Sequence, residues 1–257
     1  IEIASARVSK GEFDSVQRIM DWARKNNYLE HIEVLGFIDN HESINWVHKA
    51  GGICINLLCK GSLKQLTGQL RKKPEEHIAE IKENIAYADS LGISVNVYLE
   101  DWSNGMRNSP EYVYTLINEL SKTSIKRFML PDTLGILNPK ETYTFCRTIR
   151  SMYPHLHFDF HGHNDYDLAV ANSLAAVNAG FQGVHTSING LGERTGNTVL
   201  SSIVTCIHDH AHLKTTVQEM QLNKISKLVE SISGIRVAYN MPIIGENVFT
   251  QTAGVHA

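Results

Sequence analysis

The chain has 257 residues, of which 42 % are hydrophobic and 20 % are charged, the balance of a globular protein with one large domain or two small ones. A net charge of −3 and a pI near 6.5 lack the basic excess of nucleic-acid-binding proteins, so we expect no nucleic acid partner. No apolar run reaches the length of a membrane span, so no membrane partner is expected either. The four cysteines form no C-x-x-C pair, which is typical of a reduced, intracellular protein and indicates a cytoplasmic location.

Short apolar runs alternate with helical patterns along the chain. Strands are predicted at residues 1–5, 32–38, 52–60, 93–100, 127–133, 157–164 and 183–190. Helices are expected to begin at Pro74, at Ser109-Pro110 and at Asn138-Pro139, where a capping residue or a proline precedes a helical pattern. The helix that follows Asp167 is expected to end at Gly180. This alternation predicts a parallel sheet with crossover helices.

Polar residues recur on one face of almost every predicted strand. Counting by two from the strand ends gives Glu2, Glu33, Asn56, Asn96, Tyr98, Glu100, Thr133, Asp159, His161, His163, His185, Ser187 and Asn189. The strands of an open doubly wound sheet are buried on both faces and would be apolar throughout. A (β/α)8 TIM barrel is therefore the predicted fold, with a seven-strand open sheet as the alternative. The barrel is expected to occupy residues 1–234, followed by a tail at 235–257, and one βα unit is expected to be missing before Ile1.

Two histidines lie one residue apart where a strand-like run gives way to a polar turn. The run is Phe158-Asp159-Phe160-His161-Gly162-His163-Asn164-Asp165. Alternate side chains of a strand share a face, so His161 and His163 point the same way, about 7 Å apart along the strand. Two such imidazoles can hold one divalent metal ion, although they also suit a buried polar layer. Strand ends are where α/β proteins place their chemistry.

Two other strand ends carry candidate catalytic groups. Glu100 follows the run Val95–Leu99 and can act as a general base or orient one; the alternative is a helix cap or an ion pair with a lysine. Thr133 can donate a hydrogen bond to a bound carboxylate, although Pro131 and Asp132 also suit a simple turn.

Backbone amides of the glycine-rich stretch 187–197 suit an anion, but no phosphate fingerprint is complete. His208, His210 and His212 fall at a helix end, where a spacing of two does not bring them to one face.

Three segments together strongly resemble the metal-dependent acetyl-CoA condensing enzymes, the family of α-isopropylmalate, homocitrate and citramalate synthases. The segments are Phe160-His161-Gly162-His163-Asn164-Asp165, Leu130-Pro131-Asp132-Thr133-Leu134-Gly135 and Asn189-Gly190-Leu191-Gly192-Glu193-Arg194-Thr195-Gly196-Asn197. The resemblance covers essentially the whole chain. Residues 2–9, 96–105 and 249–257 look most like the (R)-citramalate synthase branch of this family.

The resemblance implies a role for nine residues. His161 and His163 would hold a divalent metal with Asn197 close to it, and Glu100 and His256 would help activate the acetyl group. Thr133 would contact the carboxylate of the keto acid, and Leu35, Leu58 and Tyr98 would form the pocket for its side chain. His256 would come from the other subunit of a homodimer. The family's first strand also carries an Arg-Asp pair that supplies a metal ligand; no such pair occurs in this sequence, and without it the metal site would lack one ligand.

The implied reaction joins acetyl-CoA to an α-keto acid. The metal would act as a Lewis acid on the keto acid, a base would take a proton from the acetyl methyl group, and hydrolysis of the thioester would release CoA. Zn²⁺ suits the two imidazoles and Mn²⁺ or Mg²⁺ suits added oxygen ligands. Pyruvate is the expected keto acid, giving (R)-citramalate in isoleucine biosynthesis, because the three pocket residues offer nothing to a second carboxylate.

Four alternatives remain. Isopropylmalate synthase, of leucine biosynthesis, would use α-ketoisovalerate, and homocitrate synthase would use α-ketoglutarate. A hydroxyacyl-CoA lyase would share the barrel and the metal, but such lyases carry a cysteine in the glycine-rich loop and residues 189–197 contain none. A non-catalytic barrel is the fourth.

Overall fold

A computed structural model describes residues 1–3 and 9–251 of the chain. The described residues form two compact units: the first comprises residues 1–133 and 152–159, and the second comprises residues 134–151 and 160 onward. In the described part of the chain, no helix is both long and apolar enough to cross a membrane.

All seven predicted strands are present, and most of them are a residue or two shorter than expected; residues 4 and 5 of the first predicted strand fall outside the described residues. The strands are β1 (Glu2–Ile3), β2 (Glu33–Phe37), β3 (Cys54–Lys60), β4 (Ser94–Glu100), β5 (Phe128–Asp132), β6 (Phe158–Gly162) and β7 (Gly183–His185). The pairs from β1 to β5 are parallel, and neighbours in the sheet follow chain order from β1 to β7. A doubly wound sheet reverses direction at a switch point, whereas a barrel wall does not. The predicted barrel class is thereby confirmed.

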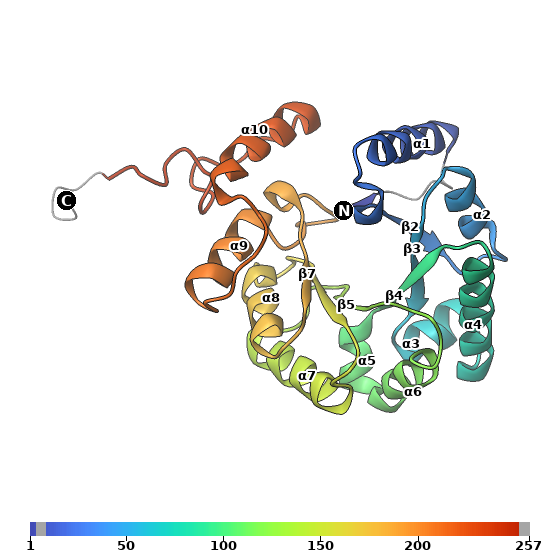
Figure 1. Cartoon of the computed structure of the whole chain (residues 1–257). Helices are drawn as coiled ribbons and strands as arrows, with labels where there is room; N and C mark the ends of the chain where they lie inside the picture. The colour runs from blue at the N-terminus through green and yellow to red at the C-terminus, as the bar shows by residue number, and fades with distance from the viewer. Residues whose placement is uncertain (4–8, 252–257) are drawn as a thin grey trace. The chain divides into compact units, whose positions relative to one another are not determined.

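The strands of the first unit have one apolar and one polar face. Register pairs Leu35 with Asn56, Leu58 with Tyr98, and Lys60 with Glu100, so these six side chains share the face that the sequence predicted to be polar. The opposite face is fully buried and apolar, with Val34, Ile55, Leu57, Val95, Val97 and Leu99. Helices α2, α4 and α6 lie along that side of the strands (Figure 1). Burial of these side chains at roughly 25 cal/mol per Å² is the main stabilising term.

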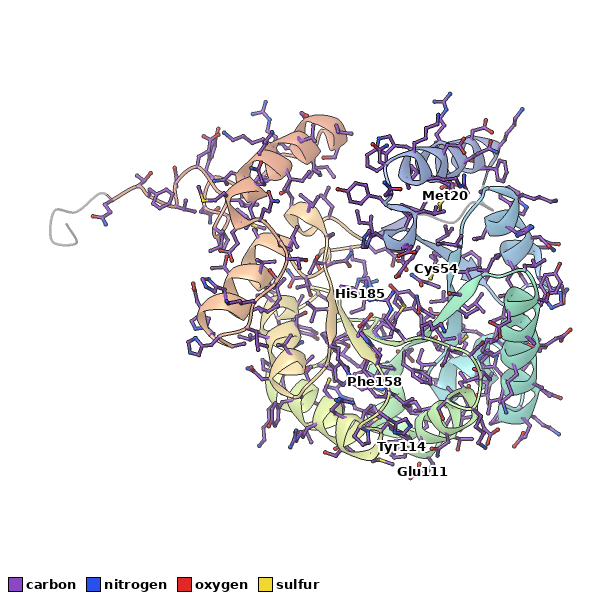
Figure 2. The ribbon with its side chains drawn as sticks, in the orientation of Figure 1. Met20, Cys54, Glu111, Tyr114, Phe158 and His185 are labelled. Atoms are coloured by element: carbon purple, nitrogen blue, oxygen red, sulfur yellow. The ribbon has the colours of Figure 1, made fainter. Side chains whose placement is uncertain are left out.

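The helices of the first unit alternate with its strands. They are α1 (Lys10–Lys25), α2 (Glu42–Lys49), α3 (Leu63–Gln65), α4 (Pro74–Ser90), α5 (Trp102–Asn108) and α6 (Pro110–Leu120), with short turns η1 (Leu29–His31) and η2 (Leu66–Leu70). Met20 is completely buried on the side of α1 that turns toward the strands (Figure 2). The predicted start of α4 at Pro74 is confirmed, and Ile78, Ile81 and Ile85 are buried on one face as their spacing indicates.

One predicted cap is wrong in detail. Helix α6 does begin at Pro110, but the Ser109 side chain does not cap it. The Ser109 hydroxyl instead accepts a hydrogen bond from the Leu63 backbone N–H at 3.3 Å. The long-range contact replaces the local one because the chain between α5 and α6 is held against the segment that follows β3.

The second unit contains α7 (Pro139–Met152), whose last residue belongs to the first unit, α8 (Ala169–Asn178), α9 (Leu200–Asp209), α10 (Leu222–Ser233), and the turns η3 (Ile188–Gly190) and η4 (Glu219–Gln221). The predicted cap of α7 is confirmed: Asn138 Oδ1 accepts the Glu141 N–H at 3.0 Å, and the Glu141 carboxylate accepts the Asn138 N–H at 3.2 Å. Gly180 follows α8 with φ of 98°, as expected for a residue just beyond a helix end.

The last strand ends earlier than predicted. β7 stops at His185 because residues 188–190 form a turn in which Asn189 has φ of 59°. Asn189 therefore does not continue the alternating polar face, whereas Ser187 is still extended and forms an isolated parallel bridge with Val199. Asn189 instead donates from Nδ2 to the Ser226 carbonyl oxygen at 3.0 Å, which ties this turn to α10.

Candidate active-site residues

The two histidines predicted to bind metal lie close together at the end of β6 in the second unit. Their Nε2 atoms are 3.2 Å apart, and their ring centroids are 4.9 Å apart. Zn–N distances are about 2.0–2.1 Å, so two nitrogen ligands in neighbouring positions around one ion lie roughly 3–3.4 Å from each other. The separation of His161 and His163 fits that of two ligands to a single divalent ion.

Burial keeps His161 in the form that binds metals. It lowers the pKa of His161 well below the usual value, and the neighbouring His185 and His163 lower it further. A neutral imidazole offers a lone pair to a metal, whereas the protonated ring does not. The His161 ring is therefore available as a ligand throughout the neutral pH range.

The glycine-rich segment folds back on the end of β6 and brings Asn197 beside the histidines. His163 and Asn197 form an isolated antiparallel bridge. On its two sides, the Asn164 N–H donates to the Gly196 carbonyl at 2.9 Å and the Thr198 N–H donates to the Gly162 carbonyl at 3.1 Å. The structure thus brings together three residues that lie up to 36 positions apart in the sequence.

The Asn197 side chain presents an oxygen suited to a metal. Its Nδ2 donates to the Leu191 carbonyl at 3.3 Å. Its Oδ1 is buried and accepts no hydrogen bond from any residue that the structure describes. A buried amide oxygen without a donor is costly unless a cation or another partner satisfies it. Two imidazoles and this oxygen fit a divalent metal, although the described residues contain no group of three or more His, Cys, Asp or Glu arranged to hold one.

An ion pair anchors the same glycine-rich segment to the turn after β6. Arg194 donates from Nε and Nη2 to the two carboxylate oxygens of Asp165, at 2.7 and 2.8 Å. This two-point contact is the geometry that guanidinium and carboxylate groups prefer. The Arg194 guanidinium lowers the pKa of Asp165. The conformation of the glycine-rich segment is thus held by side-chain and backbone hydrogen bonds within the chain.

The sequence pattern missed one neighbour of the histidine pair. The His185 ring at the end of β7 lies 5.5 Å from the His161 ring, centroid to centroid, at an interplanar angle of 77° (labelled in Figure 2). His185 shares the polar alternation of the strands, but only the pairing of the last two strands brings it beside His161.

The three predicted pocket residues lie on the polar face of the first unit. Leu58 and Tyr98 are register partners on β3 and β4, and Leu35 lies on the neighbouring β2. The Tyr98 hydroxyl forms a hydrogen bond with Glu2, and burial raises the pKa of Tyr98 well above its ordinary value. The Tyr98 phenol therefore donates a proton in this bond and remains neutral.

Glu100 pairs with a lysine that the sequence pattern did not single out. Lys60 Nζ lies 2.5 Å from Glu100 Oε2, which is the ion-pair alternative considered for Glu100. Thr133, the predicted carboxylate ligand, accepts the Asp101 N–H on Oγ1 at 2.8 Å. Asp101 itself is buried and accepts hydrogen bonds from Ser62 and Asn104, so it has a structural role.

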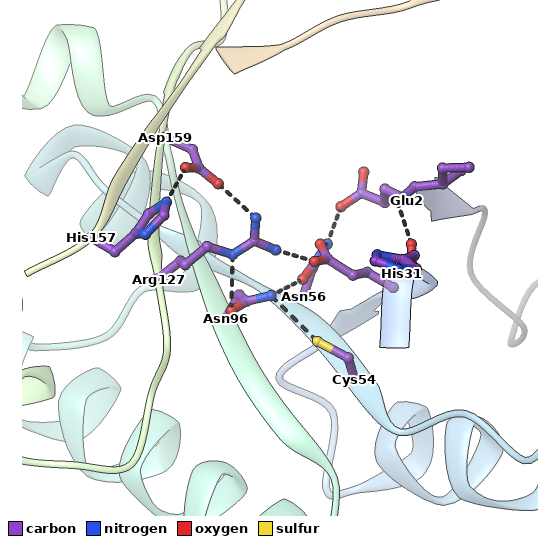
Figure 3. A network of polar contacts seen from close by, with 10 residues as sticks. Glu2, His31, Cys54, Asn56, Asn96, Arg127, His157 and Asp159 are labelled. Atoms are coloured by element: carbon purple, nitrogen blue, oxygen red, sulfur yellow. Dashed lines mark hydrogen bonds and ion pairs between the residues drawn. The ribbon is translucent and has the colours of Figure 1, made fainter. Parts of the chain in front are cut away.

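A charged network occupies the beginnings of the strands in the first unit (Figure 3). Arg127 is its centre: it donates to Asp159 at 3.0 Å, to Asn96 at 3.4 Å and to Glu33. Other bonds of the network link Asn56 to Glu2, Glu33 and Asn96, Asn96 to Cys54, and His157 to Asp159. Arg127 offsets the negative charge of the carboxylates, as buried or half-buried charges require.

The other histidines considered in the sequence are not part of the site described above. His256 falls outside the described residues. His208, His210 and His212 are exposed at or beyond the end of α9, and His208 pairs with Asp209 and Glu219 instead of with the other two.

Comparison with known proteins shows the family of the chain. The profile of the HMGL-like family matches residues 1–229. The whole chain is 33 % identical to a protein of Ignicoccus hospitalis named as a 2-isopropylmalate synthase, of which it covers 62 %. It is 30 % identical to a protein of Methanopyrus kandleri named as an (R)-citramalate synthase, of which it covers 49 %. Over 71 % of the chain, identity is 38 % to a homocitrate synthase of Sulfurisphaera tokodaii, of which 39 % is covered.

Solved structures agree on the fold. The HMG-CoA lyase of Bacillus subtilis superposes with a TM-score of 0.69 at 21 % identity, over 80 % of this chain and 71 % of that one. The HMG-CoA lyase of an Acinetobacter, solved with coenzyme A and 3-methylmalate, gives a TM-score of 0.68 at 19 % identity, over 86 % and 75 % of the two chains. Some of the curated synthases align with the whole of this chain. The chain covers 49–65 % of the length of these relatives. With its profile match, its strand order and these relatives, the chain belongs to the HMGL-like family.

Proposed function

We propose that the protein condenses acetyl-CoA with an α-keto acid. The observation that carries the proposal is the grouping of His161, His163 and the buried Oδ1 of Asn197 at the end of β6. The names of its relatives, which include synthases for isopropylmalate, citramalate and homocitrate, support the same reaction class. The protein is accordingly an acyltransferase that converts the acetyl group into an alkyl group of the product.

In this proposal a divalent metal held by His161, His163 and Asn197 supplies a Lewis acid for the keto acid. Zn²⁺, Mn²⁺ and Mg²⁺ are all compatible with two imidazoles and one amide oxygen. The Glu100 carboxylate acts as the general base toward the acetyl methyl group, together with His256. The Thr133 hydroxyl orients the carboxylate of the keto acid.

The keto acid that we propose is pyruvate, with (R)-citramalate and CoA as products in isoleucine biosynthesis. Leu35, Leu58 and Tyr98 share one face of neighbouring strands and are mainly apolar. Such a pocket suits a methyl group and offers no charge to the second carboxylate of α-ketoglutarate. An apolar pocket separates keto acids by only about 1–3 kcal/mol per methylene, so α-ketoisovalerate is the main alternative substrate.

We further propose that residues 1–234 act as the catalytic barrel and residues 235–257 as a tail that leads out of it. The protein would work in the cytoplasm as a homodimer, with His256 contributed to the site of the other subunit. Small molecules, the keto acid and acetyl-CoA, would be its substrates.

The test is CoA release from acetyl-CoA by the full-length protein, measured with a thiol reagent. The panel is pyruvate, α-ketobutyrate, α-ketoisovalerate and α-ketoglutarate, each with added Mn²⁺ or Zn²⁺. Release that is fastest with pyruvate, with citramalate identified as product, supports the proposal. A preference for α-ketoisovalerate would replace the proposed substrate, and no release with any acid would overturn the proposed reaction.

A further inference from the structure

Lys60 and Glu100 are the last residues of two paired strands and face each other. They are direct register partners at the ends of β3 and β4. Their ion pair is 2.5 Å long, and the two side chains are only 17 % and 22 % exposed. In barrels of this kind the carboxyl ends of the strands carry the active site, so this charge pair lies where chemistry is expected.

The main chain of Lys60 is fixed from both sides by buried helix residues. Its N–H donates to His77 Nε2 of α4 at 3.1 Å, and its carbonyl accepts from the Tyr112 hydroxyl of α6 at 3.1 Å. His77 and Tyr112 are 1 % and 6 % exposed. The lysine stem therefore starts from a fixed point, and the freedom that its ammonium would otherwise have is reduced.

The following residues tie the same segment to Glu100 and Thr133. The Gly61 N–H donates to the Glu100 carbonyl at 2.6 Å. The Ser62 hydroxyl donates to Asp101 Oδ2 at 2.6 Å, and the Asp101 N–H donates to Thr133 Oγ1 at 2.8 Å. One continuous set of hydrogen bonds thus runs through the ends of three neighbouring strands. These bonds fix the positions of Glu100, the proposed base, and Thr133, the proposed ligand of the keto-acid carboxylate, relative to each other.

Stability of the fold alone does not explain why an ion pair lies at this largely buried position. Removing two charges from water is energetically costly, and well-packed apolar residues often replace such a pair without loss of stability. The pair also uses only one oxygen of Glu100, because Lys60 contacts Oε2. Among the described residues, none is recorded in contact with the other oxygen, Oε1, which is thus open to a second contact.

We propose that Lys60 is a positioning residue that holds the Glu100 carboxylate for proton abstraction. The inference rests on the proposed function, in which Glu100 is the base. The Lys60 ammonium fixes Oε2, and Oε1 takes the proton from the methyl carbon of acetyl-CoA. The electron pair of that C–H bond stays on the carbon, which forms the new bond to the keto acid.

The test compares Lys60→Met with Lys64→Met in the full-length protein. Lys64 lies four residues further on and is exposed, so it is a matched control. Loss of orientation at a general base is expected to lower kcat by about 10–100-fold in Lys60→Met, with KM for the keto acid changed less than about twofold. Lys64→Met should match the wild type. In a Glu100→Gln background, Lys60→Met should have little further effect, because the lysine acts through the carboxylate.

A rescue experiment separates charge placement from damage to the fold. Methylamine added to Lys60→Ala should restore part of kcat, since it supplies an ammonium group to the space that the side chain leaves. If Lys60→Ala lost activity only because its fold is less stable, methylamine would not restore kcat.

Three outcomes would overturn the inference. An unchanged kcat in Lys60→Met beside an active wild type would show a merely structural ion pair. A raised KM for the keto acid with unchanged kcat would show that Lys60 binds substrate instead of positioning Glu100. An inactive wild type would remove the proposed function and this inference together, which distinguishes that case from the other two.

Discussion

Gly192 lies directly against the side chain of Asn197. A Cβ atom at Gly192 would be 2.6–2.8 Å from Nδ2, Cγ and Oδ1 of Asn197, and no other group of the described residues is as close. The glycine thus leaves the space in which the proposed metal-binding amide sits. A substitution at Gly192 can therefore displace the Asn197 side chain while residue 197 remains an asparagine.

Replacing Gly192 by alanine should displace Asn197 and weaken metal binding. Loss of groups that orient metal ligands typically costs about 10–100-fold in affinity, and we expect a fall of that size for Mn²⁺ or Zn²⁺ measured by titration calorimetry. Gly68→Ala is the control, because a Cβ there meets no atom within 4 Å in the part of the chain that the structure describes. Equal metal affinity in the two variants would argue against Asn197 as a ligand.

Replacing Arg127 by methionine should strongly destabilise the fold. Arg127 compensates Glu33 and Asp159, whose side chains are 19 % and 2 % exposed. Breaking such a pair leaves uncompensated charge and costs about 3 kcal/mol or more in free energy of unfolding, measured by urea denaturation. Lys82→Met, which breaks the more exposed pair with Glu119, should cost at most about 1 kcal/mol. Equal costs would show that the network in Figure 3 does not stabilise the fold.

Stability should fall as the pH drops, in part because of His77. Burial lowers the pKa of His77 to about 4, and its Nε2 must stay unprotonated to accept the Lys60 N–H. The unfolded state, with a pKa near 6.5, therefore binds the proton first, and stability is lost between about pH 6.5 and pH 4. From pH 7 to pH 5 this one group should cost about 2 kcal/mol.

The variant His77→Gln provides the comparison, since its amide oxygen can accept the same hydrogen bond without titrating. Urea denaturation at pH 7 and pH 5 should show a smaller loss of stability in His77→Gln than in the wild type. A loss of the same size in both proteins would remove His77 as the cause.

Replacing Leu58 by alanine should change the choice of keto acid. Leu58 is the register partner of Tyr98 on the polar face, and its truncation makes room for a larger side chain. The ratio of kcat/KM for α-ketoisovalerate over pyruvate is expected to rise by roughly 10–200-fold, the range for a single methylene group in an apolar pocket. Leu63→Ala, at a leucine that is 36 % exposed, should leave the ratio unchanged. No change in Leu58→Ala would place the side-chain pocket elsewhere.

Local sequence signals predicted the strands and most helix ends well. Asn138, Pro74 and Gly180 act through bonds or dihedral angles within a few residues, so their effect can be read from the sequence. The alternation of polar and apolar residues also predicted the polar face correctly, since it depends only on the period of a strand. It failed at Asn189, where a left-handed residue ends that period.

Contacts between distant segments were not predictable in the same way. The pairing of Lys60 with Glu100 depends on the register of two strands 40 residues apart. Arg127 precedes its strand and gains its role from Glu33 and Asp159, which come from two other strands. Because the register and the packing decide these contacts, the sequence alone predicted Glu100 as a candidate base but not its partner.

The most direct test of the proposed metal-dependent condensation is CoA release. The full-length protein would be assayed with acetyl-CoA and pyruvate before and after treatment with a chelator, and again after Mn²⁺ or Zn²⁺ is restored, beside the variants His161→Ala and His163→Ala. We expect release that the chelator abolishes, that the metal restores, and that both variants lack. Release that persists in the presence of the chelator or in the two variants would contradict the proposal.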